Sequence, residues 1–211
     1  RLLMVEISGK YKIGTRRFGS INWIGAWTLY KKEVLRFLIV WIQTLFSPLI
    51  TSLLFLSVLS LAIGNERGDV LGVPFIVFLA PGLIAMQIIQ QAFSHSSSSF
   101  MIGKIQGNIV DLIYAPLSAG EVTLAVTLAS VTRSVLIAII SLLVFYLFID
   151  LEIKNFFTLI VFTLLSAFSL GALGIIAGLW AEKFDHMATV TNFIIIPLSF
   201  LSGTFYSIER L

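Results

Sequence analysis

The sequence predicts an all-α membrane protein, a helical bundle, from three observations. Hydrophobic residues make up 58% of its 211 residues and charged residues only 12%, whereas soluble domains carry roughly 25% charge. Several stretches without Asp, Glu, Lys or Arg exceed the roughly 20 apolar residues that a transmembrane helix needs. The chain contains no cysteine, which excludes disulfides, thiolate catalysis and Cys-ligated metals.

The first element predicted after a basic cytoplasmic segment, residues 1–20, is an interfacial helix over residues 22–36. Its apolar and aromatic side chains recur at helical spacing: Trp23, Trp27, Tyr30 and Val34. Aromatic rings at headgroup level, with lysines toward anionic lipid, are typical of such a helix. A cytosolic extension of the first span is the alternative. Because no apolar core or small-residue cleavage site follows residues 1–20, we expect no cleaved signal peptide.

Five transmembrane helices are predicted from the charge-free stretches. Four stretches contain no charged residue, and a fifth is interrupted only by Arg133. The predicted spans are residues 37–63, 73–94, 121–148, 156–180 and 188–206. Ser118, followed three residues later by Glu121, forms a capping box at the start of the third span.

The distribution of Lys and Arg predicts the orientation. Eight of the fourteen basic residues precede the first span, and cytoplasmic flanks are the ones enriched in Lys and Arg. The N-terminus is therefore predicted to be cytoplasmic, together with the loops that hold Lys104 and Lys183. Membrane orientation explains where the basic residues lie. The expected partner is therefore the lipid bilayer, and no nucleic acid is expected.

The connection "MIGKIQGNIVDLIYAPLSAGE", residues 101–121, predicts a short amphipathic helix on the cytoplasmic side. Its apolar face comprises Ile102, Ile105, Ile109, Leu112 and Ile113. Lys104, Asn108 and Asp111 fall on the other face, and Pro116 cannot continue the helix. Such a helix can dock onto a soluble partner, and a surface helix without a partner fits the pattern equally well.

Two stripes of small residues lie inside the spans. The polar stripe comprises Thr123, Thr127, Ser130, Ser134 and Ser141, and the other comprises Ala167, Gly171, Gly174, Gly178 and Ala181. The glycine stripe favours close helix packing, whereas the polar stripe suits either interhelical hydrogen bonds or the wall of a polar path. Arg133 either faces the bundle interior or anchors the helix by snorkelling to the headgroups.

A further polar face lies at the end of the second span. It comprises Gln87, Gln90, Gln91, Ser94, His95 and Ser98, and a helix end that reaches water is favoured over a cytoplasmic entrance. His95 and His186 are the only histidines, so neither a metal site nor a His-based hydrolase is expected. No nucleophile elbow or phosphate-binding G-x-x-x-x-G-K-[ST] loop occurs. The chain is therefore not expected to be an enzyme, and any ATPase must be another chain.

Four segments resemble the permease subunits of type-2 ABC exporters, the ABC-2 type transporter family. They are "INWIGAWTLYKKEVLRF", "FLAPGLIAMQII", "IVDLIYAPLSAGE" and "IIIPLSFLSGTFYSIERL", and the resemblance covers residues 21–211. It implies six spans with both termini cytoplasmic, and two permease copies, here a homodimer, paired with two ATPase subunits. ATP and Mg²⁺ would bind the ATPases, so no cofactor is expected on this chain.

The helical patterns, combined with the resemblance, give the candidate residues. A coupling helix over about residues 101–114 would contact the ATPase through Lys104, Gln106, Asn108, Asp111 and Tyr114. The translocation path or the helix packing would involve Thr127, Ser130, Arg133, Ser134, Gly171, Gly174 and Gly178. The external mouth would hold Tyr206, Glu209 and Arg210, followed in the family by a re-entrant hairpin and a sixth span. Five spans therefore suggest a C-terminally truncated chain.

The predicted function is the permease subunit of an ATP-driven exporter in the inner membrane. Its substrate would be drug-like, lipid or polysaccharide, because the polar stripes suit all three. The alternatives are an ATP-independent secondary transporter and a membrane assembly or structural protein. Arg133 alone could serve ion coupling and no internal repeat is visible, both of which argue against a secondary transporter.

Overall fold

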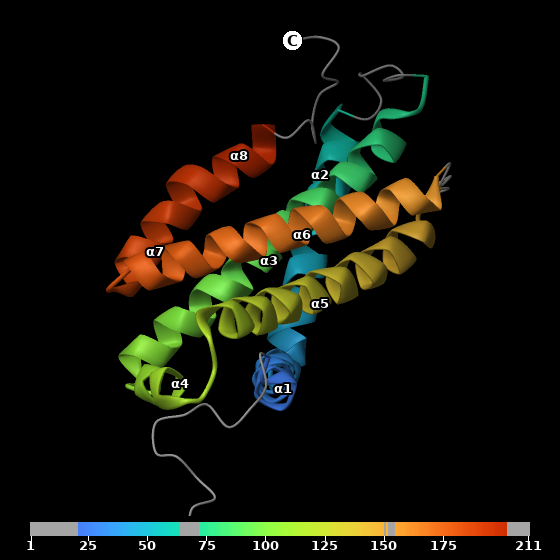
Figure 1. Ribbon diagram of the computed structural model, residues 1–211. Helices are drawn as coiled ribbons and strands as arrows, with labels where there is room; N and C mark the ends of the chain where they lie inside the picture. Colours follow the sequence, from blue (N-terminus) through green and yellow to red (C-terminus); the bar gives the residue numbers. More distant parts are fainter. Residues whose placement is uncertain (1–20, 64–71, 150, 152–154, 202–211) are drawn as a thin grey trace, which may run out of the picture.

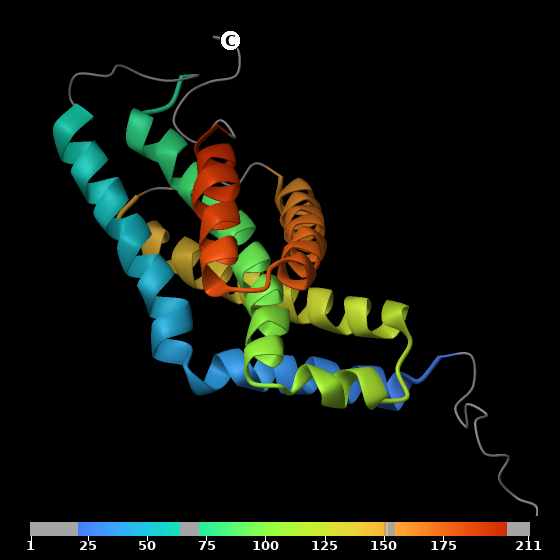
Figure 2. The same ribbon diagram turned by 90° about the vertical axis from the view of Figure 1, so that its left-hand side faces the viewer.

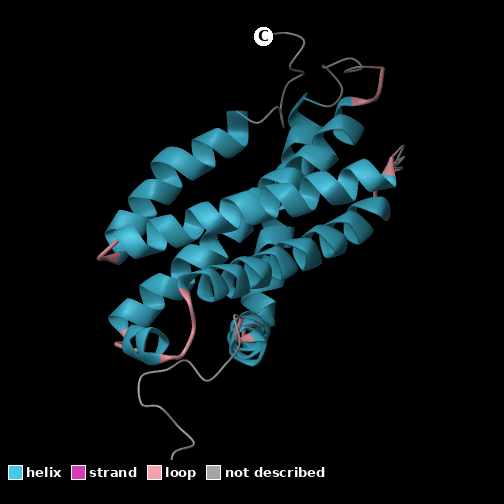
Figure 3. Cartoon of the chain, viewed as in Figure 1, coloured by secondary structure: helices cyan, strands magenta, loops and turns pink. Residues whose placement is uncertain are grey.

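The computed structural model describes residues 21–63, 72–149, 151 and 155–201, and this part consists of helices joined by short loops (Figure 3). The prediction of an all-α membrane protein is confirmed. The basic segment, residues 1–20, and the predicted external mouth at Tyr206, Glu209 and Arg210 lie outside the described residues.

The chain enters the bundle through α1, Trp23–Ile39, whose first backbone N–H groups are capped by Asn22. The Asn22 side-chain oxygen accepts a hydrogen bond of 2.9 Å from the backbone N–H of Gly25, as expected of an N-cap. α1 lies across one end of the bundle, and α2, Ser47–Ile63, leaves it steeply (Figure 2). The predicted start of the first span at residue 37 is therefore wrong, because residues 37–39 still belong to α1.

Among the described residues, five helical stretches are long and apolar enough to cross a membrane, as predicted. They are Ile42–Ala62, Phe75–Ile105, Ala119–Tyr146, Phe156–Trp180 and Phe184–Leu201. Helices α3, α5 and α6, the second to fourth of these stretches, pack against one another at the centre of the bundle (Figure 1). The fifth stretch combines α7, Phe184–Val190, a π-helical segment and α8, Ile196–Leu201.

In the described part of the chain, one π-helical segment begins the first span and another interrupts the fifth. Ile42–Phe46 ends two residues before Pro48, and Thr191–Ile195 ends two residues before Pro197. A proline inside a helix has no N–H to donate, and its ring clashes with the carbonyl four residues earlier. Widening the preceding turn relieves this clash, so the prolines explain where both segments lie.

The connection between α3 and α5 differs from its prediction. α3, Phe75–Ile105, continues about eleven residues beyond the predicted end of the second span, and the separate helix α4 covers only Ile109–Tyr114. Gly107 separates them with a positive φ of 76°, a conformation that favours glycine. The predicted helix over residues 101–114 is thus two helices with a turn between them.

The glycine stripe of α6 lies where this helix crosses α3 and α5. A Cβ atom at Gly174 would stand 2.5 Å from the Phe93 carbonyl oxygen, and one at Gly178 would stand 2.7 Å from that of Ser97. At Gly171 the nearest atom would be the Ser130 hydroxyl of α5, at 2.3 Å. The missing side chains let the backbones of α6 and α3 approach closely, which is how small residues stabilise helix pairs in lipid.

Candidate functional site

Helix α4 lies at the same end of the molecule as α1 (Figures 1 and 2). Ile109 and Leu112 are half-buried against a cluster that includes Leu29 of α1. Ile113 and Tyr114 are 73% and 84% exposed, and Asp111 is exposed beside them. Ile113 was expected on the apolar face with Ile109 and Leu112, but in the fold it is exposed.

The other predicted coupling residues lie around the turn before α4. Gln106 and Asn108 are exposed, and the Asn108 amide donates a 3.1 Å hydrogen bond to Gln106 Oε1. Lys104 differs, because its ammonium donates to the carbonyl oxygens of Leu179 and Ala181, the latter at 3.0 Å. These carbonyls end α6, where a cation is stabilised by the helix dipole. The Lys104 ammonium therefore has partners within the chain.

Glu121 joins the start of α5 to the start of α1. Its Oε2 accepts a 2.7 Å hydrogen bond from the Ser118 backbone N–H, which completes the predicted capping box. Its Oε1 accepts a 2.6 Å hydrogen bond from the Asn22 backbone N–H. The Asn22 amide also donates to the Pro116 carbonyl at 3.2 Å. The capping box is confirmed, and its link to α1 had no signal in the sequence.

Polar side chains that are buried or half-buried form a column along one face of α3. Gln87, Gln91 and His95 lie on successive turns, and His95 is fully buried. The interpretation of this face as a helix end reaching water is wrong for Gln87 and His95, which are buried, and α3 continues past them to Ile105. The column instead contacts α1, α2 and α5.

Gln87, at the end of the column farthest from α1, connects three spans by hydrogen bonds. Its amide nitrogen donates to the Pro48 carbonyl at 2.8 Å and to the Ser52 hydroxyl of α2. Its amide oxygen accepts a 3.0 Å hydrogen bond from the Ser141 hydroxyl of α5. Ser141, in the predicted polar stripe, thus makes an interhelical hydrogen bond.

Replacing Gln87 by alanine is expected to lower the free energy of unfolding by about 2 kcal/mol, since interhelical hydrogen bonds in membranes average about 0.6 kcal/mol each. The thermal midpoint of the detergent-purified protein measures the loss. Gln90→Ala, at a half-buried neighbour on α3, is the matched control. Equal midpoints for the two variants would contradict the assigned hydrogen bonds.

A charged cluster lies further along the column, toward α1. Glu33 is only 2% exposed; its Oε2 lies 3.1 Å from the Arg36 guanidinium and 3.8 Å from His95 Nε2. Arg36 also donates to the His95 carbonyl at 3.1 Å. The arrangement fastens the C-terminal half of α1 to α3. The burial of Glu33 was not predicted from the sequence. The spacing was a usable signal, because Glu33 lies four residues from both Leu29 and Phe37, which are the other buried residues of α1.

Arg133 points into the same region from α5. Its guanidinium donates a 2.6 Å hydrogen bond to Gln91 Oε1 of α3. Of the two interpretations of Arg133, this contact matches the bundle interior. A charged side chain directed inward is typical of intramembrane arginines.

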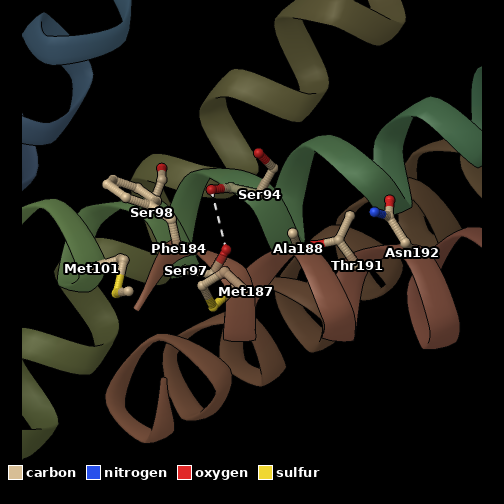
Figure 4. A pocket seen from close by; sticks show the side chains of 9 residues that line it. All are labelled: Ser94, Ser97, Ser98, Met101, Phe184, Met187, Ala188, Thr191 and Asn192. Carbon is tan, nitrogen blue, oxygen red and sulfur yellow. Dashed lines mark hydrogen bonds between the residues drawn. The ribbon is translucent and has the colours of Figure 1, made fainter. Parts of the chain in front are cut away.

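Two cavities lie along one face of α3. The larger, about 350 Å³, is bounded by α3, α7 and the following π segment (Figure 4); its lining residues are Ser94, Ser97, Ser98, Met101, Phe184, Met187, Ala188, Thr191 and Asn192. The smaller, about 170 Å³, lies between α2 and α3; Thr51, Ser52, Gln87, Gln90 and Gln91 supply its polar groups, with Ser47. Both combine an apolar wall with hydroxyl and amide groups.

The polar stripe of α5 lies elsewhere. Thr127, Ser130 and Ser134 are fully buried, and neither of these two cavities is lined by them. The Ser130 hydroxyl donates to the Thr127 carbonyl at 2.7 Å within α5. The sequence suggested the polar stripe of α5 as a possible wall of a polar path. The two cavities are instead lined by polar residues of α2, α3 and the fifth span. Within the described ranges, no three His, Asp or Glu side chains could hold a metal ion together.

Comparison with known proteins identifies the family. The chain is 30% identical over 191 residues to the inner membrane transport permease YadH of Escherichia coli K12, which covers 90% of this chain and 75% of that protein. It is 26% identical over 201 residues to Nodulation protein J of Rhizobium leguminosarum bv. trifolii, covering 92% and 73%. No solved structure matches. Residues 25–211 match the ABC-2 type transporter family, and the chain therefore belongs to this family as a multi-pass membrane transport permease.

Proposed function

We propose that this chain is the transmembrane subunit of an ATP-driven exporter, with ATP and Mg²⁺ bound and hydrolysed on a separate ABC ATPase. The observation that carries this proposal is the surface of α4. Ile113 and Tyr114 are large and exposed beside Asp111, on a six-residue helix outside the spans. An exposed apolar surface with polar neighbours is typical of a protein contact.

The proposed orientation places α1, α4 and the N-terminus on the cytoplasmic side of the inner membrane. Lys31 and Lys32 on α1 are exposed, and such cations favour the cytoplasmic leaflet with its anionic lipids. Trp23 and Trp27 are exposed on the same helix and fit an interfacial position. α4 would then face a soluble ATPase.

The two cavities beside α3 support a substrate path in a homodimer. Gln90, Ser94 and Asn192 contribute polar groups to this face, and polar groups in contact with hydrocarbon are costly. A second permease copy or an amphiphilic substrate would cover them. Hydroxyl and amide groups on an apolar wall suit a drug-like, lipid or polysaccharide substrate.

The transport cycle follows from this arrangement. ATP binding would close the paired ATPases and displace α4, and the spans would change from an inward-open to an outward-open state. ATP can drive this change only through its different affinity for the two states. The permease itself supplies the bistable element and no bond-making chemistry.

Co-purification with an ABC ATPase tests the proposal. We expect Asp111→Lys combined with Tyr114→Ala to abolish co-purification and ATP-dependent export from cells, with membrane insertion unchanged. Asn155→Asp is the matched control, because this exposed N-cap of α6 lies at the opposite membrane end and aspartate caps equally well. Export that persists without any ATPase would contradict the proposal and favour a secondary transporter.

A further inference from the structure

We propose that Lys104 and Glu121 are positioning residues that fasten the α3–α4–α5 hairpin to two other helix ends, so that displacement of α4 moves α1 and the end of α6 with it. That an ATPase displaces α4 rests on the proposed function. The two residues flank α4, with Lys104 near the end of α3 and Glu121 near the start of α5.

Glu121 makes the first fastening through two helix N-termini. One carboxylate, buried in the protein, accepts the Ser118 N–H at 2.7 Å and the Asn22 N–H at 2.6 Å. Both N–H groups belong to N-cap residues, where the helix dipole favours negative charge. Hydrogen bonds to an ionised acceptor are about twice as strong as neutral ones, so the shared carboxylate holds α1 and α5 together.

The link from Asn22 to Pro116 extends this fastening to the chain between α4 and α5. The Asn22 amide donates to the Pro116 carbonyl at 3.2 Å, while its oxygen caps α1 through Gly25. Any shift of the segment after α4 therefore pulls on the first turn of α1.

Lys104 makes the second fastening at a helix C-terminus. Its ammonium binds the carbonyls of Leu179 and Ala181 at the end of α6. The electrostatics are the reverse of those at Glu121, because a helix C-terminus favours a cation. The last turn of α3 is thereby tied to the start of the α6–α7 loop.

Each fastening leads to the wall of a different cavity. α1 continues through Ile42–Phe46 into α2, which forms one wall of the smaller cavity. The end of α6 leads within three residues to Phe184, where α7 begins as a wall of the larger cavity. α3 is the opposite wall of both. Displacing α4 would thus move the two outer walls relative to α3.

Spin-label distances in the permease alone, reconstituted in nanodiscs, test the two fastenings separately. One label pair joins Val110 on α4 to Thr28 on α1, and the other joins Val110 to Lys183 after α6; all three sites are exposed. We expect Glu121→Gln to broaden only the 28–110 distance distribution, because the amide cannot accept both N–H groups. Lys104→Gln should broaden only the 110–183 distribution.

The controls separate these effects from misfolding. Glu182→Gln, an exposed carboxylate in the α6–α7 loop, should change neither distribution. Asn22→Ala, which removes the amide link to Pro116, should broaden the 28–110 distribution even if Glu121→Gln does not fold. Unchanged distributions in Asn22→Ala and Lys104→Gln would overturn the proposal.

The complex with the ATPase provides the functional measurement. Each fastening variant should lower export per ATP hydrolysed by about fivefold or more, the lower range of typical coupling energies, with ATPase binding retained. Normal coupling in both variants would overturn a role in transmission. Failure of any ATPase to bind would contradict the proposed function, but it would leave the spin-label results on the permease alone intact.

Discussion

Replacing Gly174 by valine is expected to prevent the native packing of α6 against α3. Even the Cβ atom would stand 2.5 Å from the Phe93 carbonyl oxygen and 3.1 Å from Ser96 Cβ. The first contact is backbone, so no rotamer change can relieve it, and the helices must separate. Inserting extra carbon atoms into a packed core costs about 1–3 kcal/mol or more, and we expect at least the upper value here.

The measurement is the thermal midpoint in detergent, with Gly174→Ala as the smaller step and Gly120→Ala as the matched control. A Cβ at Gly120 meets nothing within 4 Å, and alanine is favoured over glycine in helices by up to about 1 kcal/mol. Gly120→Ala should therefore melt at or slightly above the wild-type temperature. A wild-type midpoint for Gly174→Ala would contradict the close approach of α3 and α6.

The glycine stripe shows what the sequence predicts well. Spacings of three and four residues determine which glycines share a helix face, and small residues on one face of a span have few uses other than close packing. The predicted fourth span, residues 156–180, also coincides with α6. It is bounded by charged residues on both sides, so composition alone locates its ends.

The positions at which one helix ends and the chain turns into the next helix were not predictable from composition. Residues 37–39 carry no charge, yet they finish α1 rather than begin the first span. The extension of α3 to Ile105 was missed because polar residues such as Gln87 and His95 were interpreted as part of a helix end that reaches water. They are buried against other helices, and burial depends on tertiary neighbours that periodicity within one segment does not contain.

Partners between helices were missed for the same physical reason. Lys104 was assigned to an ATPase surface from its position on a helical face, whereas in the fold it reaches α6 from 75 residues away in sequence. The second bond of Glu121 spans 99 residues to Asn22. A capping box is visible within four residues, but a carboxylate shared between two helix starts is visible only in three dimensions.

Replacing Glu33 by glutamine is expected to destabilise the protein by about 3–5 kcal/mol, the typical effect of removing one partner from a buried ion pair. The carboxylate lies 3.1 Å from the Arg36 guanidinium and is almost completely buried. Without Glu33, the Arg36 guanidinium would lose its 3.1 Å partner while its own side chain remains only 27% exposed.

The sign of the coupling with Arg36 separates this explanation from a general packing defect. If the loss in Glu33→Gln comes from uncompensated positive charge, Arg36→Gln added to it should restore part of the thermal midpoint. Lys32→Gln is the matched control, because Lys32 lies 3.8 Å from Glu33 with its own side chain 66% exposed, and exposed pairs contribute about 0–1 kcal/mol. Additive losses in the Glu33→Gln/Arg36→Gln double variant would show that packing, rather than charge, holds α1 against α3.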